Sequence, residues 1–121
     1  MKRFLAISSV FALTLLLGAS SVPASAANAP QVFTINASST ALFTPDQITV
    51  HAGEPVELKL VGKDGVHEIA SSALGIPSTL ITPGTTKTVT FTPAKAGTYT
   101  LHCLIPCGPD HDKMIITITV V

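Results

Sequence analysis

The sequence predicts an all-β sandwich, and three observations support this fold class. Apolar and polar residues alternate with period two in several short runs, as they do in strands with one buried face. Turn-forming segments such as Lys63-Asp64-Gly65 and Thr82-Pro83-Gly84 separate these runs. Threonine, which favours strands over helices, is frequent within them. Short strands at this spacing are typical of a β-sandwich.

The predicted strands follow one another from residue 32 onward. The first alternates Phe33 and Ile35 with their neighbours, and a short run at 48–50 ends in a glycine-containing turn. The next strand, at 56–60, alternates three aliphatic residues with a glutamate and a lysine. Residues 70–82 show no clear alternation, so the sequence predicts a loop there that crosses one end of the sandwich.

Three further strands are predicted in the second half of the chain. Residues 88–92 alternate threonine with valine and phenylalanine, and residues 116–120 alternate isoleucine or valine with threonine. The run at 98–103 places Cys103 on the same face as two apolar residues and His102 on the opposite face.

The N-terminal segment differs from the rest of the chain. It begins with two positive charges, continues with an apolar run at 4–17, and ends in a small-x-small motif at Ala26. This arrangement predicts that residues 1–26 are a cleavable signal peptide and that residues 27–121 form one exported domain. The apolar run is shorter than the roughly 20 residues that cross a bilayer, although an uncleaved anchor is the alternative.

Composition excludes several classes of protein. The chain is 46% hydrophobic and only 12% charged, so it is not a disordered tail. Its seven basic residues are balanced by seven acidic ones, which argues against binding to nucleic acid. No nucleophile–base pair and no phosphate-binding loop are recognisable, so we expect no enzymatic activity. Export predicts a periplasmic or otherwise extracytoplasmic location.

One motif carries the chemistry. Cys103, Cys107, His111 and Met114 form the pattern C-x3-C-x3-H-x2-M. Thiolate and imidazole ligands select copper or zinc over hard cations, and the thioether favours copper. A compact loop usually needs a ligand from elsewhere, and His67 is the candidate because it opens a strand-like stretch after a turn.

At these residues the chain resembles the binuclear copper A domain of cytochrome c oxidase subunit II. The metal loop and the preceding Gly97-Thr98-Tyr99 carry the likeness. Further similar segments lie upstream: Phe43-Thr44-Pro45, Asp64-Gly65-Val66-His67, Leu74-Gly75-Ile76 and Pro83-Gly84. The resemblance covers residues 32 to 121 and implies a Greek-key cupredoxin β-sandwich, which agrees with the strand pattern.

The resemblance also implies a role for each residue of the site. Cys103 and Cys107 would bridge two copper ions as thiolates, and His67 and His111 would each cap one ion. A rigid site shared by two metals spreads the transferred charge, so the implied function is the transfer of single electrons. The implied partner is a redox protein such as a c-type cytochrome or a terminal oxidase.

Two weaker ligands follow from the same resemblance. Met114 would bind one copper ion, and the main-chain carbonyl of Ile105 would bind the other. The family commonly has glutamate at the position of Ile105, but a carbonyl ligand does not depend on the side chain.

Three other interpretations of the same residues remain open. A mononuclear type 1 copper site would use Cys107, His111, Met114 and His67 and leave Cys103 unused. A periplasmic copper carrier or assembly factor would use the same ligands to deliver copper to a partner. A structural sandwich would simply join the two cysteines in a disulfide, as exported pairs often do.

Overall fold

The computed structural model describes residues 29–121, which form strands and a single short 3-10 helix. The elements are β1 (Gln31–Ser38), β2 (Leu42–Thr44), β3 (Gln47–Val50), β4 (Val56–Gly62), β5 (His67–Ser71), β6 (Ile76–Ile81), β7 (Thr86–Phe91), β8 (Gly97–His102), η2 (His111–Lys113) and β9 (Ile115–Val120). The predicted all-β fold class is confirmed. The predicted signal peptide lies outside the described residues.

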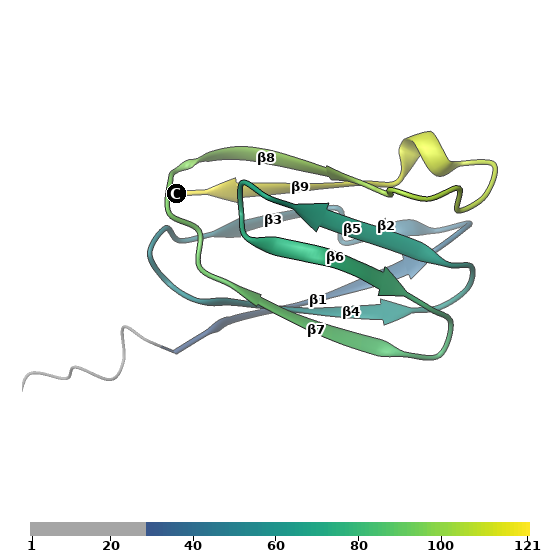
Figure 1. Cartoon of the computed structure of the whole chain (residues 1–121), viewed down its shortest axis with the longest axis horizontal. Coiled ribbons are helices and arrows are strands. Elements are labelled where there is room, and N and C mark those ends of the chain that lie inside the picture. The colour runs from purple at the N-terminus through teal and green to yellow at the C-terminus, as the bar shows by residue number, and fades with distance from the viewer. Residues whose placement is uncertain (1–28) are drawn as a thin grey trace, which may run out of the picture.

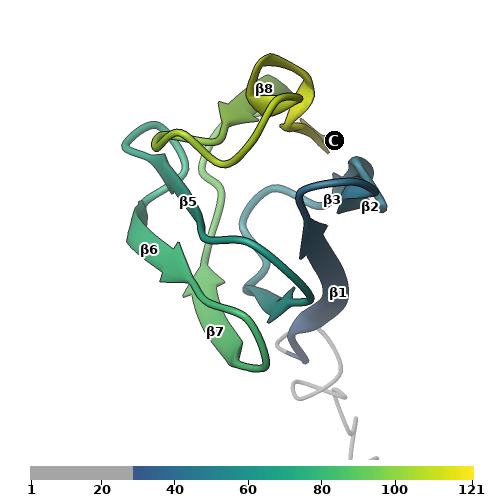
Figure 2. The same ribbon diagram turned by 90° about the vertical axis from the view of Figure 1, so that its right-hand side faces the viewer.

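The strands form two layers around one core (Figures 1 and 2). One layer is a four-stranded sheet in the order β2-β1-β4-β7, and the other contains the three-stranded sheet β3-β9-β8. The hairpin β5-β6 forms a third small sheet, and it contacts β8 on one side and β7 on the other. The pairs β1–β4 and β3–β9 are parallel, because the chain crosses between the layers before it returns.

The period-two pattern correctly identifies the buried faces. In β4, Val56, Leu58 and Leu60 are fully buried, whereas Lys59 between them is exposed. At the end of β8, Cys103 is buried and His102 is exposed, as the alternation predicts. Burial of these aliphatic side chains supplies most of the stabilisation, at about 25 cal/mol per Å² of apolar surface.

The loop predicted for residues 70–82 is wrong, because this stretch contains the end of β5 and all of β6. The register shifts between Ile69 and Ser71, and this irregularity breaks the alternation. In β6 the buried residues are Ile76 and Ile81, five positions apart, with exposed or half-buried residues between them. A short strand that buries only its two ends shows no period-two signal.

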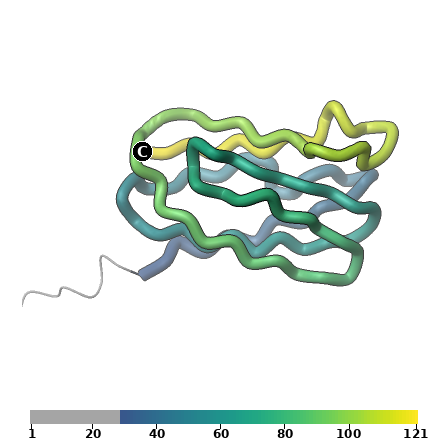
Figure 3. The backbone as a smooth tube through the Cα atoms, in the orientation of Figure 1, coloured from purple at the N-terminus to yellow at the C-terminus, as the bar shows by residue number. Residues whose placement is uncertain are grey.

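Of the connections at the end of the molecule on the right of Figures 1 and 3, three concern the site. They are the β1–β2 turn, the β4–β5 loop, and the long β8–β9 loop that contains η2. His67 opens β5 directly after the second of these loops. The fold therefore brings this histidine to the same end as the C-x3-C-x3-H-x2-M motif. Among the described residues, no helix is both long enough and apolar enough to cross a membrane.

Candidate metal centre

His67 lies at the centre of the site with its side chain fully buried. Its Nε2 atom is 2.7 Å from the carbonyl oxygen of Asp64, a group that can only accept, so Nε2 carries the proton. Its Nδ1 atom is buried and has no hydrogen-bond partner in the described part of the chain. The ring also meets Phe43 edge-on, with 6.2 Å between ring centres. The unpaired nitrogen lone pair is therefore held in a fixed direction.

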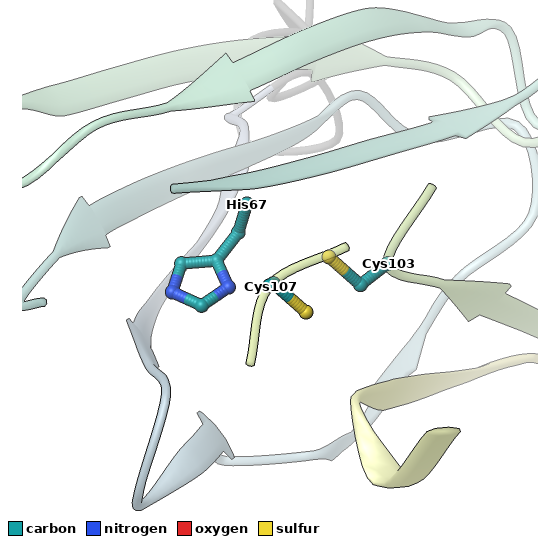
Figure 4. A group of neighbouring side chains, drawn as sticks. All are labelled: His67, Cys103 and Cys107. Atoms are coloured by element: carbon teal, nitrogen blue, oxygen red, sulfur yellow. The ribbon is translucent and has the colours of Figure 1, made fainter. Parts of the chain in front are cut away.

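The two cysteines face this nitrogen. Cys103 follows β8 directly, Cys107 lies four residues further along the loop, and both are buried free thiols. The two sulfur atoms and one ring nitrogen of His67 all lie within 4.8 Å of one another. Figure 4 shows both sulfur atoms on the side of the imidazole that carries Nδ1.

The remaining residues of the motif contact the same sulfur atoms. Cys107 Sγ lies 3.3 Å from His111 Nδ1 and 3.3 Å from Met114 Sδ. Cys103 Sγ lies 3.4 Å from the carbonyl oxygen of Ile105. The structure thus brings together all the ligands expected from the sequence, which are His67, Cys103, Ile105, Cys107, His111 and Met114. That each of them binds copper stays a prediction.

Backbone hydrogen bonds fix the ends of the metal loop. The amide of Cys103 donates to the carbonyl of Met114 at 3.0 Å, which continues the β8–β9 ladder to the first and last members of the motif. The amide of Leu104 donates to the carbonyl of Glu68 at 2.9 Å and ties the loop to β5. The position of the sulfur atoms relative to His67 is therefore set by the two sheets.

Electrostatics favour a neutral thiol in the absence of metal. Burial, with a further contribution from the neighbouring Cys103, raises the pKa of Cys107 to about 12. A buried thiol without a nearby positive charge is unreactive, whereas a bound metal ion stabilises the thiolate. Metal binding at this site must therefore release protons.

Ser38 and Ser39, which lie behind the ligands and bond to Asp64, could not be predicted from the sequence as part of the site. Asp64 accepts a hydrogen bond from the hydroxyl of Ser38 and another from the amide of Ser39, both at 2.7 Å. These two bonds hold the pKa of Asp64 below its usual range. Ser39 is far from the motif in sequence, so no spacing pattern links it to Cys107, whose carbonyl it contacts.

The other histidines lie outside the cluster. His102 and His51 are both exposed, and neither belongs to the His–Cys–Cys cluster. Asp110 pairs with Lys113 at 3.2 Å on the surface, a type of contact that contributes little to stability.

The residues present fit copper. The unpartnered Nδ1 of a fully buried histidine is an unsatisfied acceptor, which proteins rarely leave without a ligand. It faces two thiols, of which Cys107 is in contact with a second imidazole and a thioether. A set of thiolate, imidazole and thioether donors is typical of copper electron-transfer sites.

Comparisons with known proteins agree with this fold. The sequence profile of the cupredoxin-like domain family matches residues 7–116. Among solved structures, the periplasmic domain of subunit II of cytochrome oxidase (CoxB) of Bradyrhizobium japonicum is 31% identical, with a TM-score of 0.57. That match covers 62% of this chain and 54% of the oxidase domain.

Two more distant structures share the fold. A haem–copper terminal oxidase dimer contains a chain that is 23% identical over 75% of this chain and 65% of its own, with a TM-score of 0.64. The metal-binding domain of the Cu(I)-exporting P-type ATPase CopA of Streptococcus pneumoniae, with Cu(I), is 20% identical over 74% of this chain and 84% of its own, with a TM-score of 0.61.

The chain spans 54% of the length of the first oxidase chain that it matches and 65% of the second. No curated protein sequence matches it. The profile nevertheless covers most of the chain, and the sandwich and the His–Cys–Cys cluster agree with it. The chain belongs to the cupredoxin-like domain family.

Proposed function

We propose that this chain is an exported copper protein that holds a binuclear copper A centre and transfers single electrons. Copper supplies the one-electron redox change when it is bound. Cys103, Cys107, His67 and His111 would hold the copper, with Met114 and the Ile105 carbonyl as weaker donors. One observation carries the proposal: the unpartnered Nδ1 of His67 faces both Cys103 and Cys107 in the core.

The two sulfur atoms have different neighbours, and this supports a site for two metals. Cys107 contacts His111 and Met114, whereas Cys103 contacts the carbonyl of Ile105. A mononuclear type 1 site would need only the first of these groups together with His67. The second thiol is buried within reach of the same histidine, which favours a shared pair of thiolates over a single copper ion.

Two features of the site support electron transfer. The loop is fixed by backbone bonds from Cys103 to Met114 and from Leu104 to Glu68 in β5, so we expect little rearrangement when the charge changes. The site is also close to the surface. Val66 and Leu104 directly adjoin His67 and Cys103 in sequence, and their side chains are 40% and 52% exposed. An electron has only a short distance to travel between the cluster and a partner.

The proposed setting is the periplasm or another exported location. The predicted signal peptide and the periplasmic oxidase domain among the relatives support this location. The partner would be a redox protein such as a c-type cytochrome or a terminal oxidase. With no catalytic group assigned at the site, we expect the chain to conduct electrons and not to act as an enzyme.

Reconstitution tests this proposal. The purified domain is reduced, loaded with copper, and analysed for copper content and by electron paramagnetic resonance. The proposal predicts two copper ions per chain and a hyperfine pattern produced by an electron shared between two copper nuclei. One copper ion per chain with a single-nucleus pattern would support the type 1 interpretation.

A copper carrier remains the competing function, because a copper-exporting ATPase domain shares the fold. The two functions differ in how firmly copper is held. A carrier yields copper to a competing chelator within minutes, whereas an electron-transfer protein keeps it through many redox cycles. Measurement of copper retention during repeated oxidation and reduction separates them.

A further inference from the structure

The β1–β2 turn contacts both loops that carry the proposed copper ligands. This turn is Ser38–Ala41, and we call it the serine turn. Ser38 and His67 are the two polar side chains that are buried in the described part of the chain. A buried hydroxyl needs hydrogen-bond partners, and Ser38 has several. These bonds fix the position of Ser38 in the fold.

Asp64 anchors the serine turn to the β4–β5 loop. Its carboxylate accepts from the hydroxyl of Ser38 and from the amide of Ser39, each at 2.7 Å. The hydroxyl of Ser38 also accepts from the amides of Thr40 and Ala41 at 3.2 Å, so the turn itself is closed. The main-chain carbonyl of the same Asp64 accepts the hydrogen bond from Nε2 of His67.

Ser39 extends the connection to the metal loop. Its hydroxyl donates to the carbonyl of Cys107 at 3.0 Å, although the two residues are 68 positions apart in sequence. Ser39 thus bonds through its amide to the loop of one ligand and through its hydroxyl to the loop of another. A change in the position of either loop would strain or break one of these bonds.

Gly65 in the β4–β5 loop and Gly108 in the β8–β9 loop leave room for the side chain of Ser39. A Cβ atom on Gly65 would collide with Ser39 Oγ and would lie 3.2 Å from His67 Nε2. Gly108 approaches the other side, where an added Cβ would lie 3.5 Å from Ser39 Cβ. Both glycines have positive φ values, +70° and +128°. Ser39 therefore lies between two backbone segments that approach it closely.

We propose that Ser39, anchored by Asp64, is a positioning residue of the metal centre that fixes the Cys107 loop relative to His67. This inference rests on the proposed function, because it concerns the ligands of the proposed copper ions. Outer contacts of this kind orient ligands, and their loss typically lowers metal affinity roughly 10- to 100-fold. In the metal-free protein, the bonds of Ser39 to Asp64 and to the Cys107 carbonyl would keep the Cys107 loop closed.

The test compares Ser39→Ala with Thr79→Val. Both variants remove one hydroxyl that donates to a main-chain carbonyl, but the Thr79 hydroxyl donates to Pro77 within β6 and not to a ligand loop. In the metal-free protein we expect iodoacetamide to alkylate Cys107 roughly fivefold faster in Ser39→Ala, the shift expected when one neutral hydrogen bond is lost. Thr79→Val should react within twofold of wild type.

The copper-loaded protein gives the second readout. We expect Ser39→Ala to release copper to a chelator roughly tenfold faster than wild type and to show altered copper hyperfine splitting. Thr79→Val should match wild type in both. Asp64→Asn, which keeps the shape of the side chain but replaces one acceptor oxygen with a donor group, should change both readouts in the same direction and keeps the test available if Ser39→Ala does not fold.

Two results would overturn this inference. One is equal alkylation, release and hyperfine splitting in Ser39→Ala and wild type. The other is an equal change in Ser39→Ala and Thr79→Val, which would mean a general loss of stability. Failure of the proposed function is a different result, namely that wild type itself takes up no copper, and the alkylation comparison still decides whether Ser39 holds the Cys107 loop.

Discussion

At the scale of single residues, the two cysteines have unequal roles. Cys107 Sγ contacts both His111 and Met114. Cys103 Sγ contacts the carbonyl oxygen of Ile105 instead. Removal of the first sulfur therefore disconnects more of the proposed ligand set than removal of the second. The sequence motif indicates the same difference, because a type 1 site could use Cys107 and leave Cys103 unused.

The variants Cys107→Ser and Cys103→Ser test this asymmetry. We expect Cys107→Ser to lose the visible colour of the copper-loaded protein, because His111 and Met114 no longer share a sulfur with the other ligands. Cys103→Ser should retain one copper ion, with the hyperfine pattern of a single nucleus. Visible absorption and copper analysis measure both. Persistent colour in Cys107→Ser would show that the ligand assignment is wrong.

The buried thiol predicts how stability depends on pH. Cys107 has a pKa of about 12 in the folded protein and 9.0 as an ordinary thiol. The unfolded state therefore loses this proton first, and the stability of the metal-free protein decreases as the pH rises from about 9 towards 12. Below about pH 9 the full contribution is present.

Urea unfolding of metal-free protein across this pH range measures the effect. Cys107→Ser is the matched control, since it removes the titrating thiol and leaves the other alkaline groups in place. The free energy of unfolding should fall less steeply with pH in the control than in wild type. Identical slopes in the two proteins would contradict the role assigned to this thiol.

At the scale of elements, the sheets determine where the ligands lie. β9 pairs with both β8 and β3, so it is the central strand of its sheet, and Met114 directly precedes it. Ile116 in β9 is fully buried. The strand thus contributes to the core and positions the last residue of the motif.

Ile116→Ala tests the contribution of this strand to stability. Deletion of a buried isoleucine side chain should lower the free energy of unfolding by about 2–5 kcal/mol. Thr100→Ala on the neighbouring strand β8 is the control, and because Thr100 is exposed we expect a change of about 0.5 kcal/mol or less. Urea denaturation of both variants measures the difference. Equal effects would contradict the assignment of the core face.

The extent to which the sequence predicts these elements depends on how regular they are. β4 and β8 alternate strictly, and their buried faces follow from the pattern alone. β6 buries only Ile76 and Ile81, and the irregular register of β5 near Ser71 hides the pairing of the hairpin. The period-two pattern therefore fails to predict a short strand in which only the first and last residues are buried.

The same limit applies to the site. His67 and the C-x3-C-x3-H-x2-M motif can be selected from residue types and spacing, because soft donors in a short loop are rare. Ser39 cannot, since its contacts to Asp64 and Cys107 arise only when three loops meet at one end of the sandwich. Residue chemistry predicts the ligands, and only the folded topology reveals what positions them.

At the scale of the whole molecule, a small sandwich brings donor atoms from distant parts of the chain into one buried cluster. One layer supplies the serine turn, β5 supplies His67, and the β8–β9 loop supplies the sulfur donors and the second imidazole. Metal bound to such a cluster stabilises the fold, because the ligand geometry does not exist in the unfolded chain. Copper loading should therefore raise the midpoint of thermal unfolding relative to the metal-free protein.

The most direct test of the central claim is electron paramagnetic resonance of the copper-loaded domain, combined with copper analysis of the same sample. A binuclear centre predicts two copper ions per chain and an unpaired electron shared by both nuclei. One copper ion with a single-nucleus pattern, or no copper uptake by the reduced protein, would contradict it.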